Sequence, residues 1–114
     1  MRLGCHWIAE VSPEASLTLT DRARVLQFLA ALPKELGLTA VHPPAVQQGD
    51  DGSVRGVVLL SESHASAHTD PERGLVFVDL FSCTPFSQEE ARRILLETWP
   101  GHLVVDRFLE RGVS

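Results

Sequence analysis

The chain has 114 residues and a formal net charge of −5, with 44% hydrophobic and 22% charged residues. This length and balance predict one globular domain with enough apolar mass for a core, and they exclude a disordered chain. The ten Lys and Arg residues are too scattered to form a basic face for nucleic acid, and no apolar run approaches the roughly 20 residues that span a bilayer.

Two segments have the pattern of helices. The first follows a capping residue at Thr20 or Asp21, has apolar residues at helical spacing and is expected to close at Pro33 and Gly37. The second is expected at 89–99, after a capping box formed by Ser87 and Glu90.

The remaining elements are predicted to be strands. They are expected at 3–11, 38–42, 54–61, 65–69, 75–83 and 102–109, with a loop at 43–53. The segment 75–83 alternates most clearly and has the strongest β character. Two helices with mostly antiparallel strands predict an α+β fold, a two-layer sandwich with both helices on one face of the sheet.

The numbers and positions of cysteine and aromatic residues limit the expected cellular compartment and the classes of ligand. Cys5 and Cys83 make no disulfide framework, and the first residues lack a signal-peptide core, so we expect a cytoplasmic protein. We expect neither a membrane nor a nucleic-acid partner. The chain has five Phe, two Trp and no Tyr, and none lies between Leu29 and Val76. That stretch offers no ring to stack on a nucleobase.

Reactive side chains are densest at 61–69, which reads Ser-Glu-Ser-His-Ala-Ser-Ala-His-Thr. On a helix, His64 and His68 would share a face and form a metal pair, but the flanking strands favour an extended segment and we expect no metal. A plain alternative is a polar hairpin whose Ser and His residues satisfy backbone groups.

The pair Glu62-Ser63 allows a specific chemistry. A hydroxyl in a strained turn can attack the preceding carbonyl and convert the amide to an ester, with an imidazole relaying protons. Elimination of that ester cuts the chain and leaves a dehydroalanine, which hydrolyses to an N-terminal pyruvoyl group. Such a ketone can condense with a substrate amine and act as an electron sink.

The sequence resembles the prokaryotic S-adenosylmethionine decarboxylases, which are self-processing pyruvoyl enzymes of polyamine synthesis. The similarity extends over most of the chain, and its central motif is long and specific. It includes Leu3-Gly4-x-His6-x-x-x-Glu10, Gly56-Val57-Val58, the segment 61–69, Pro71-Glu72-x-Gly74 and Val78-Asp79-Leu80-Phe81-Ser82-Cys83.

The resemblance implies roles for particular residues. Cleavage is expected between Glu62 and Ser63, giving a β chain of 1–62, an α chain of 63–114 and a covalent pyruvoyl group derived from Ser63. Neither a metal nor pyridoxal phosphate is expected. His68 is implied as the proton-transfer residue of processing, and Cys83 as the acid that protonates the substrate's α-carbon after carbon dioxide leaves. The alternative for Cys83 is a small buried thiol at a strand end.

The resemblance also implies a binding site and an assembly. Glu10, His64 and Glu72 match positions that line the family's site for a small-molecule substrate, whereas Asp79 has the simpler interpretation of a polar residue on a strand face. The family implies a homodimer of cleaved protomers in which the sheets form a larger assembly. The active site then lies near the interface and is built from both protomers.

Three positions depart from the family pattern. The residue before Gly-Val-Val is usually Ser or Thr and assists processing, but here it is Arg55, so Ser53 and Ser66 are the candidate replacements. The family clamps adenine between rings, whereas the loop at 43–53 has no aromatic residue and the position after His-Thr is Asp70. Trp7 is a candidate for one substitute ring, with core packing as its alternative.

Asp70 suggests an altered substrate. With Glu72 it can accept a guanidinium or an ammonium group, which favours a basic amino acid, L-arginine or L-ornithine, over S-adenosylmethionine. The alternative is a surface ion pair with Arg55 or Arg73, and an Arg55 inside the pocket would oppose a cationic substrate. A further alternative is an unprocessed, non-catalytic paralogue that regulates a partner decarboxylase.

Overall fold

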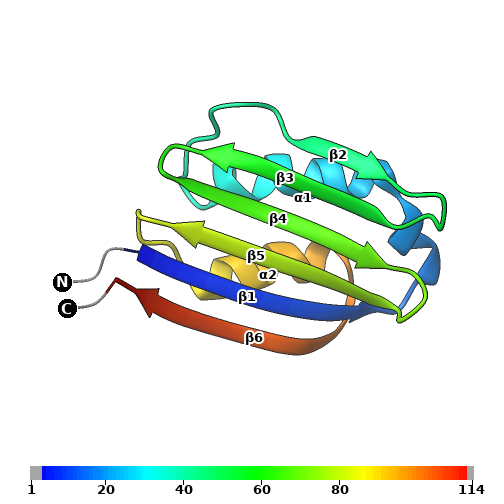
Figure 1. Ribbon diagram of the computed structural model, residues 1–114. Coiled ribbons are helices and arrows are strands. Elements are labelled where there is room, and N and C mark those ends of the chain that lie inside the picture. The colour runs from blue at the N-terminus through cyan, green and yellow to red at the C-terminus, as the bar shows by residue number, and fades with distance from the viewer. Residues whose placement is uncertain (1–3, 113–114) are drawn as a thin grey trace.

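The computed structural model describes residues 4–112, which form a six-stranded sheet covered by two helices. The elements in chain order are β1 (Gly4–Pro13), a short 3-10 helix η1 (Ser16–Thr20), α1 (Arg22–Glu35), β2 (Ala45–Gln48), β3 (Val54–Leu60), β4 (Ser63–Asp70), β5 (Leu75–Ser82), α2 (Gln88–Thr98) and β6 (Gly101–Arg111). The strand order is β2-β3-β4-β5-β1-β6, and all neighbouring strands are antiparallel. Both helices lie behind the sheet in Figure 1, which confirms the predicted two-layer α+β sandwich.

The core fills the space between the sheet and the helices. Residues alternate between buried and more exposed along β3, β4 and β5, as a sheet covered on one face requires. Phe28 of α1 meets Trp99 just beyond α2 with ring centroids 5.1 Å apart, which joins the two helices. At Gly56, an added Cβ would lie 2.6 Å from Cδ1 of Leu29, so a glycine is needed where β3 approaches α1.

The opposite surface of the sheet carries no helix, and we call it the open face. It faces the viewer in Figure 1. By the strand register its side chains come from Arg55, Val57 and Leu59 of β3, His64, Ser66 and His68 of β4, Phe77, Asp79 and Phe81 of β5, His6, Ile8 and Glu10 of β1, and Arg107 and Leu109 of β6.

Several predicted boundaries were wrong for identifiable reasons. The segment 38–42 forms only a bridge from Ala40 to Leu60, and the edge strand is β2, inside the predicted loop. An edge strand paired on one side is half exposed, so β2 lacks a clear apolar alternation. Of the two residues expected to close α1, Pro33 lies within the helix, whereas Gly37 follows its end with a φ of +76°, as predicted. Residue 3 of the predicted first strand lies outside the described residues.

The strand predicted at 65–69 is longer, running from Ser63 to Asp70. Thr69 explains one end of this strand, because its buried Oγ1 accepts a hydrogen bond of 2.9 Å from the backbone N–H of Val54. The other end places Ser63 directly after the β3–β4 turn, opposite Leu60.

Candidate active site

The β3–β4 turn contains only Ser61 and Glu62, because Leu60 and Ser63 already pair across the hairpin. Glu62 has a φ of +66° and is the only non-glycine residue in 4–112 with a positive φ. Glycine is preferred at the second position of a turn that requires a positive φ, and the left-handed conformation costs an L-residue roughly 1–2 kcal/mol. The peptide bond between Glu62 and Ser63 therefore follows a strained residue.

The Ser63 hydroxyl is held only loosely. It is 3.4 Å from the carbonyl oxygen of Ser61, to which it donates, and it accepts from the backbone N–H of Cys83, also at 3.4 Å. Both distances are long for hydrogen bonds that involve a hydroxyl, so the oxygen can leave these partners readily. The Cys83 side chain is exposed, which corrects the interpretation of a small buried thiol. The fold thus brings Ser63 and Cys83 together across β4 and β5.

Beside Ser63, the open face carries an aromatic and imidazole cluster centred on Phe81. The rings of His64 and His6 lie 6.0 and 6.2 Å from the Phe81 ring, measured between centroids. The guanidinium carbon of Arg111 is 4.9 Å from the Phe81 centroid, within cation–π range. His6 Nε2 lies 3.2 Å from Oδ1 of Asp79. This cluster gives the Ser63 end of the open face its rings.

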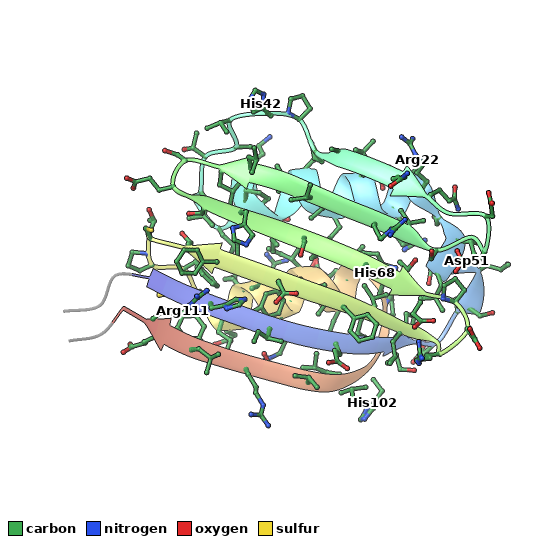
Figure 2. All side chains as sticks on the ribbon, in the orientation of Figure 1. Arg22, His42, Asp51, His68, His102 and Arg111 are labelled. Carbon is green, nitrogen blue, oxygen red and sulfur yellow. The ribbon has the colours of Figure 1, made fainter. Side chains whose placement is uncertain are left out.

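Two other predicted site residues, His68 and Glu10, lie at the far end of the open face. His68 pairs directly with Arg55 on β3 and with Phe77 on β5, and Phe77 in turn pairs with Glu10 on β1. Because Ser63 and His68 are five residues apart on one strand, their Cα atoms lie about 16 Å apart. Figure 2 shows His68 and Arg111 toward opposite ends of the face. His68 therefore cannot reach the Ser63 hydroxyl of its own chain.

Arg55 stands on the open face, where its charge acts weakly on Asp51, whose pKa is lowered mainly by hydrogen bonds from Ser53. The Arg55 side chain is exposed, and it makes no hydrogen bond or ion pair with any other residue in 4–112. It lines a hollow of about 350 Å³ at the β2–β3 edge together with Ala45, Val46, Gln47 and Val57. It points to the same side of the sheet as His68, so a guanidinium and an imidazole lie side by side.

Asp70 is already engaged. Its carboxylate accepts from the backbone N–H of Arg73 at 3.0 Å and from the Arg73 guanidinium at 2.7 Å. The hydrogen bond from the Arg73 side chain is the main reason that the pKa of Asp70 lies below its ordinary value. The surface-pair alternative therefore describes Asp70. Glu72 lies exposed in the same turn.

The prediction for Trp7 needs correction, and the one for Ser53 stays a prediction. Trp7 is fully buried on the helix side, where its Nε1–H donates to Asp106 at 2.8 Å, so it offers no ring to a ligand. Asp106 also accepts from Gln88 and from Arg92, which fixes Trp7 in a network that joins β1, β6 and α2. Ser53 precedes β3, and its hydroxyl donates to Asp51 at 2.6 Å, so its assistance to processing stays a prediction.

The sequence analysis missed several residues of the open face. Phe77 and Phe81 provide rings, and His6 provides an imidazole, although none of them was among the predicted site residues. The alternating pattern in 75–83 already indicated that the odd-numbered and even-numbered residues lie on opposite faces of a strand. Only the pairing of β4 with β5 shows that the odd residues share a face with His64 and His68. Ser66 lies on this face between Val57 and Asp79.

The extended β4 strand rules out the helical metal pair, because His64 and His68 are about 13 Å apart along it. In residues 4–112, no three His, Cys, Asp or Glu side chains gather as metal ligands do. No helix in the described part of the chain is both long and apolar enough to cross a membrane.

A hydroxyl after a strained residue, a thiol-bearing residue beside it and an open sheet backed by helices are the features of a self-processing decarboxylase proenzyme. The family model "S-adenosylmethionine decarboxylase" matches residues 5–112. The chain belongs to the S-adenosylmethionine decarboxylase family, and it is a pyruvoyl-dependent carboxy-lyase of that type. In these proenzymes the pyruvoyl group forms by self-cleavage at a serine.

Curated relatives and a solved structure agree with this assignment. The S-adenosylmethionine decarboxylase proenzyme of Archaeoglobus fulgidus is 35% identical over 112 residues, covering 94% of this chain and 99% of the relative. The proenzyme of Moorella thermoacetica is 33% identical over 112 residues, covering 97% and 89%. The crystal structure of adenosylmethionine decarboxylase from Aquifex aeolicus VF5 superposes with a TM-score of 0.84 at 28% identity, covering 99% of this chain and 93% of that one.

Proposed function

We propose that this chain cleaves itself between Glu62 and Ser63 and then decarboxylates S-adenosylmethionine as a homodimer. Cleavage yields a β chain of 1–62 and an α chain of 63–114. The observation that carries the proposal is the left-handed Glu62 immediately before a loosely held Ser63 hydroxyl.

The self-cleavage needs no added oxidant or reductant, because each bond that forms is matched by one that breaks. Ser63 Oγ attacks the carbonyl carbon of Glu62, the C–N bond breaks, and the hydroxyl proton passes to the departing nitrogen, which leaves an ester. A base then removes the α-proton of residue 63, the Cβ–Oγ bond breaks, and Glu62 leaves as a carboxylate. The resulting dehydroalanine takes up water and releases ammonia, so that a ketone remains.

We propose that a second copy completes the site, because the predicted site residues divide between the two ends of the sheet. Ser63, His64 and Cys83 belong to one end, while His68 and Glu10 belong to the other. A two-fold axis that runs across the strands near Ser66, between two stacked open faces, brings each His68 over the Ser63 end of its partner. Exposed apolar side chains, namely Val57 at 41% and Leu59 at 52% exposure, suit such a stacked interface.

After cleavage, the pyruvoyl group supplies the electron sink for loss of carbon dioxide. The chain's own residues bind the substrate and manage protons and water around it. Cys83 returns a proton to the α-carbon, a task that its exposed position next to Ser63 supports. His64 and Glu10 line the substrate space, and the stacked sheets exclude water from it. A reducing cytoplasm keeps the Cys83 thiol free.

Two arguments favour S-adenosylmethionine as the substrate. Phe77 and Phe81 place rings on the open face that the aromatic-free stretch cannot provide, and stacking a base on a ring contributes roughly 1–3 kcal/mol. The preference for L-arginine or L-ornithine depended on the Asp70 carboxylate, which Arg73 already occupies.

A basic amino acid is the second candidate. It is favoured by the absence of any aromatic residue from the loop before β3 and by the replacement of a ring by Asp70. The surface pair between Asp70 and Arg73 is weak enough for a guanidinium ligand to displace, since exposed pairs contribute about 0–1 kcal/mol.

The decisive experiment combines intact mass and turnover. The purified protein should show two fragments that meet at Glu62/Ser63, with a carbonyl that borohydride reduces. Ser63→Ala should remain a single 12.5 kDa chain, whereas Ser53→Ala should cleave normally. Carbon dioxide release from S-adenosylmethionine, L-ornithine and L-arginine then identifies the substrate. Release from S-adenosylmethionine alone supports the first candidate, and release from a basic amino acid alone supports the second.

An uncleaved wild-type chain without a reducible carbonyl would overturn the enzymatic proposal. That result would favour the third interpretation, a non-catalytic paralogue that dimerises with an active decarboxylase.

A further inference from the structure

Arg55 is the cation at the His68 end of the open face. Within residues 4–112 its charge acts only weakly on Asp51, whose pKa is lowered mainly by hydrogen bonds from Ser53, and no hydrogen bond or ion pair neutralises Arg55. Arg55 and His68 are directly paired across β3 and β4, so their Cα atoms lie about 4.5–5.5 Å apart. On this face Asp79 is already paired with His6, and no ion pair joins Arg55 to Glu10 in residues 4–112. A cation covered by a stacked sheet needs an anionic group to face it, since burying an unpaired charge is costly.

The pairing of β3 with β4 indicates which groups of the partner face Arg55 across the proposed interface. Arg55 is opposite His68, while the hairpin turn of Ser61 and Glu62 joins Leu60 to Ser63 at the other end of the same two strands. The two-fold axis that brings His68 over the partner's Ser63 end therefore brings Arg55 over the end of the partner's β3, at Leu59 and Leu60, from where its long side chain can extend to the adjoining turn. The anionic groups there are the Glu62 carboxylate and the oxyanion that forms on the Glu62 carbonyl when Ser63 attacks it.

We infer that Arg55 stabilises this oxyanion in trans, so that each chain supplies the electrophilic group for its partner's self-cleavage. The inference rests on the proposed self-cleaving dimer. The guanidinium stays charged through the reaction and presents several N–H donors in a fixed fork. It neither gives nor takes a proton. His68 relays the serine proton, while Arg55 holds the negative charge on the carbonyl oxygen until the C–N bond breaks.

Because of where Arg55 lies, its role in cleavage can be tested without destabilising the fold. Its side chain is exposed and forms no hydrogen bond within the described residues, so its removal should leave the melting temperature of a Ser63→Ala background unchanged. The Arg22→Ala variant is the matched control. Arg22 is also an exposed cation, but it lies at the start of α1 and makes only a long 3.4 Å contact with the Val46 carbonyl.

The first test follows cleavage of freshly synthesised protein on denaturing gels. Arg55→Ala should slow cleavage on the order of 100-fold, the usual loss for one oxyanion donor. Arg55→Lys should lose less, because it keeps the charge but not the fork, and Arg22→Ala should cleave at the wild-type rate. Cleavage of Arg55→Ala at the wild-type rate would overturn the inference while leaving the proposed function intact, whereas an uncleaved wild type would instead defeat the proposed function.

The second test separates action in trans from action within one chain. A tagged Arg55→Ala chain, which keeps Ser63, is coexpressed with an excess of Ser63→Ala chains, which keep Arg55 but cannot be cleaved. Tag capture verifies that the two chains associate. In these mixed dimers the tagged chain should regain cleavage, and an Arg55→Ala/Ser63→Ala partner should not restore it. Captured mixed dimers without rescue would refute donation across the interface.

Discussion

The strained turn residue permits a quantitative test of how the fold promotes cleavage. Glu62 has a φ of +66°, a conformation that is unfavourable for an L-residue by roughly 1–2 kcal/mol and nearly free of strain for glycine. Because Glu62 becomes a chain end when its bond to Ser63 breaks, cleavage releases that strain. If all of it is released at the transition state, Glu62→Gly should cleave about 5- to 30-fold more slowly, since about 1.4 kcal/mol corresponds to tenfold in rate.

Glu62→Ala is the matched control for this substitution. It removes the carboxylate but keeps the Cβ that causes the strain, so it should cleave at close to the wild-type rate. The assay is the time course of fragment formation after rapid synthesis and purification. Urea unfolding in a Ser63→Ala background measures the strain independently, and there the glycine variant should be about 0.5–1 kcal/mol more stable than the alanine variant.

The two measurements refute different parts of the reasoning. A glycine variant that is less stable than the alanine variant would mean that the left-handed turn stores no strain, because only the greater unfolded-chain entropy of glycine would then separate the two. A stability gain for glycine together with an unchanged cleavage rate would mean that the strain exists but is not released during the chemistry.

Three further outcomes follow from the geometry. Cys83→Ala should cleave normally and lose most carbon dioxide release, and full turnover by the cleaved variant would remove the thiol from the mechanism. Thr69→Val should lower the unfolding free energy in urea by about 1–3 kcal/mol, because it leaves the buried Val54 N–H without an acceptor. Thr69→Ser keeps the hydroxyl and is the control, so a larger loss of stability in Thr69→Ser than in Thr69→Val would contradict this reasoning. Burial raises the pKa of Asp106, but its hydrogen bonds outweigh burial and hold the pKa below its ordinary value. Its stabilisation is therefore complete above the unfolded pKa of about 3.9 and is lost as the pH falls through the lower folded value. Asp106→Asn should lower stability by about 1–2 kcal/mol at pH 7 and by much less near pH 2, whereas an equal loss at both pH values would exclude the charge as the cause.

The distinction between sequence and structure is clearest at β4 and its neighbours. The motif at 61–69 identified the family and drew attention to Ser63, because the order of reactive residues is a local property of the chain. The strand boundaries near it were predictable to within a few residues where alternation was strong, as in β5. At β2 the prediction was wrong, because an exposed edge strand is defined by its pairing with β3 and not by an apolar pattern of its own.

The aromatic-free stretch illustrates the same distinction for the site. Its composition correctly predicted that β3 and β4 offer no ring, and it suggested Trp7 as a substitute. Strand parity, however, directs Trp7 toward the helices and its sequence neighbour His6 toward the open face, and pairing with β4 brings Phe77 and Phe81 beside His68 and His64.

The sequence by itself determined the family, the two-layer fold and the bond predicted to break, because each depends on patterns within short segments. Only the tertiary structure decided that Glu62 is left-handed, that Asp70 is held by Arg73 and that Arg55 lies beside His68 without a hydrogen bond or ion pair in residues 4–112. Backbone strain depends on a complete hairpin, and charge neutralisation depends on which side chains the sheet brings into range. Neither can be evaluated until distant residues have been placed together.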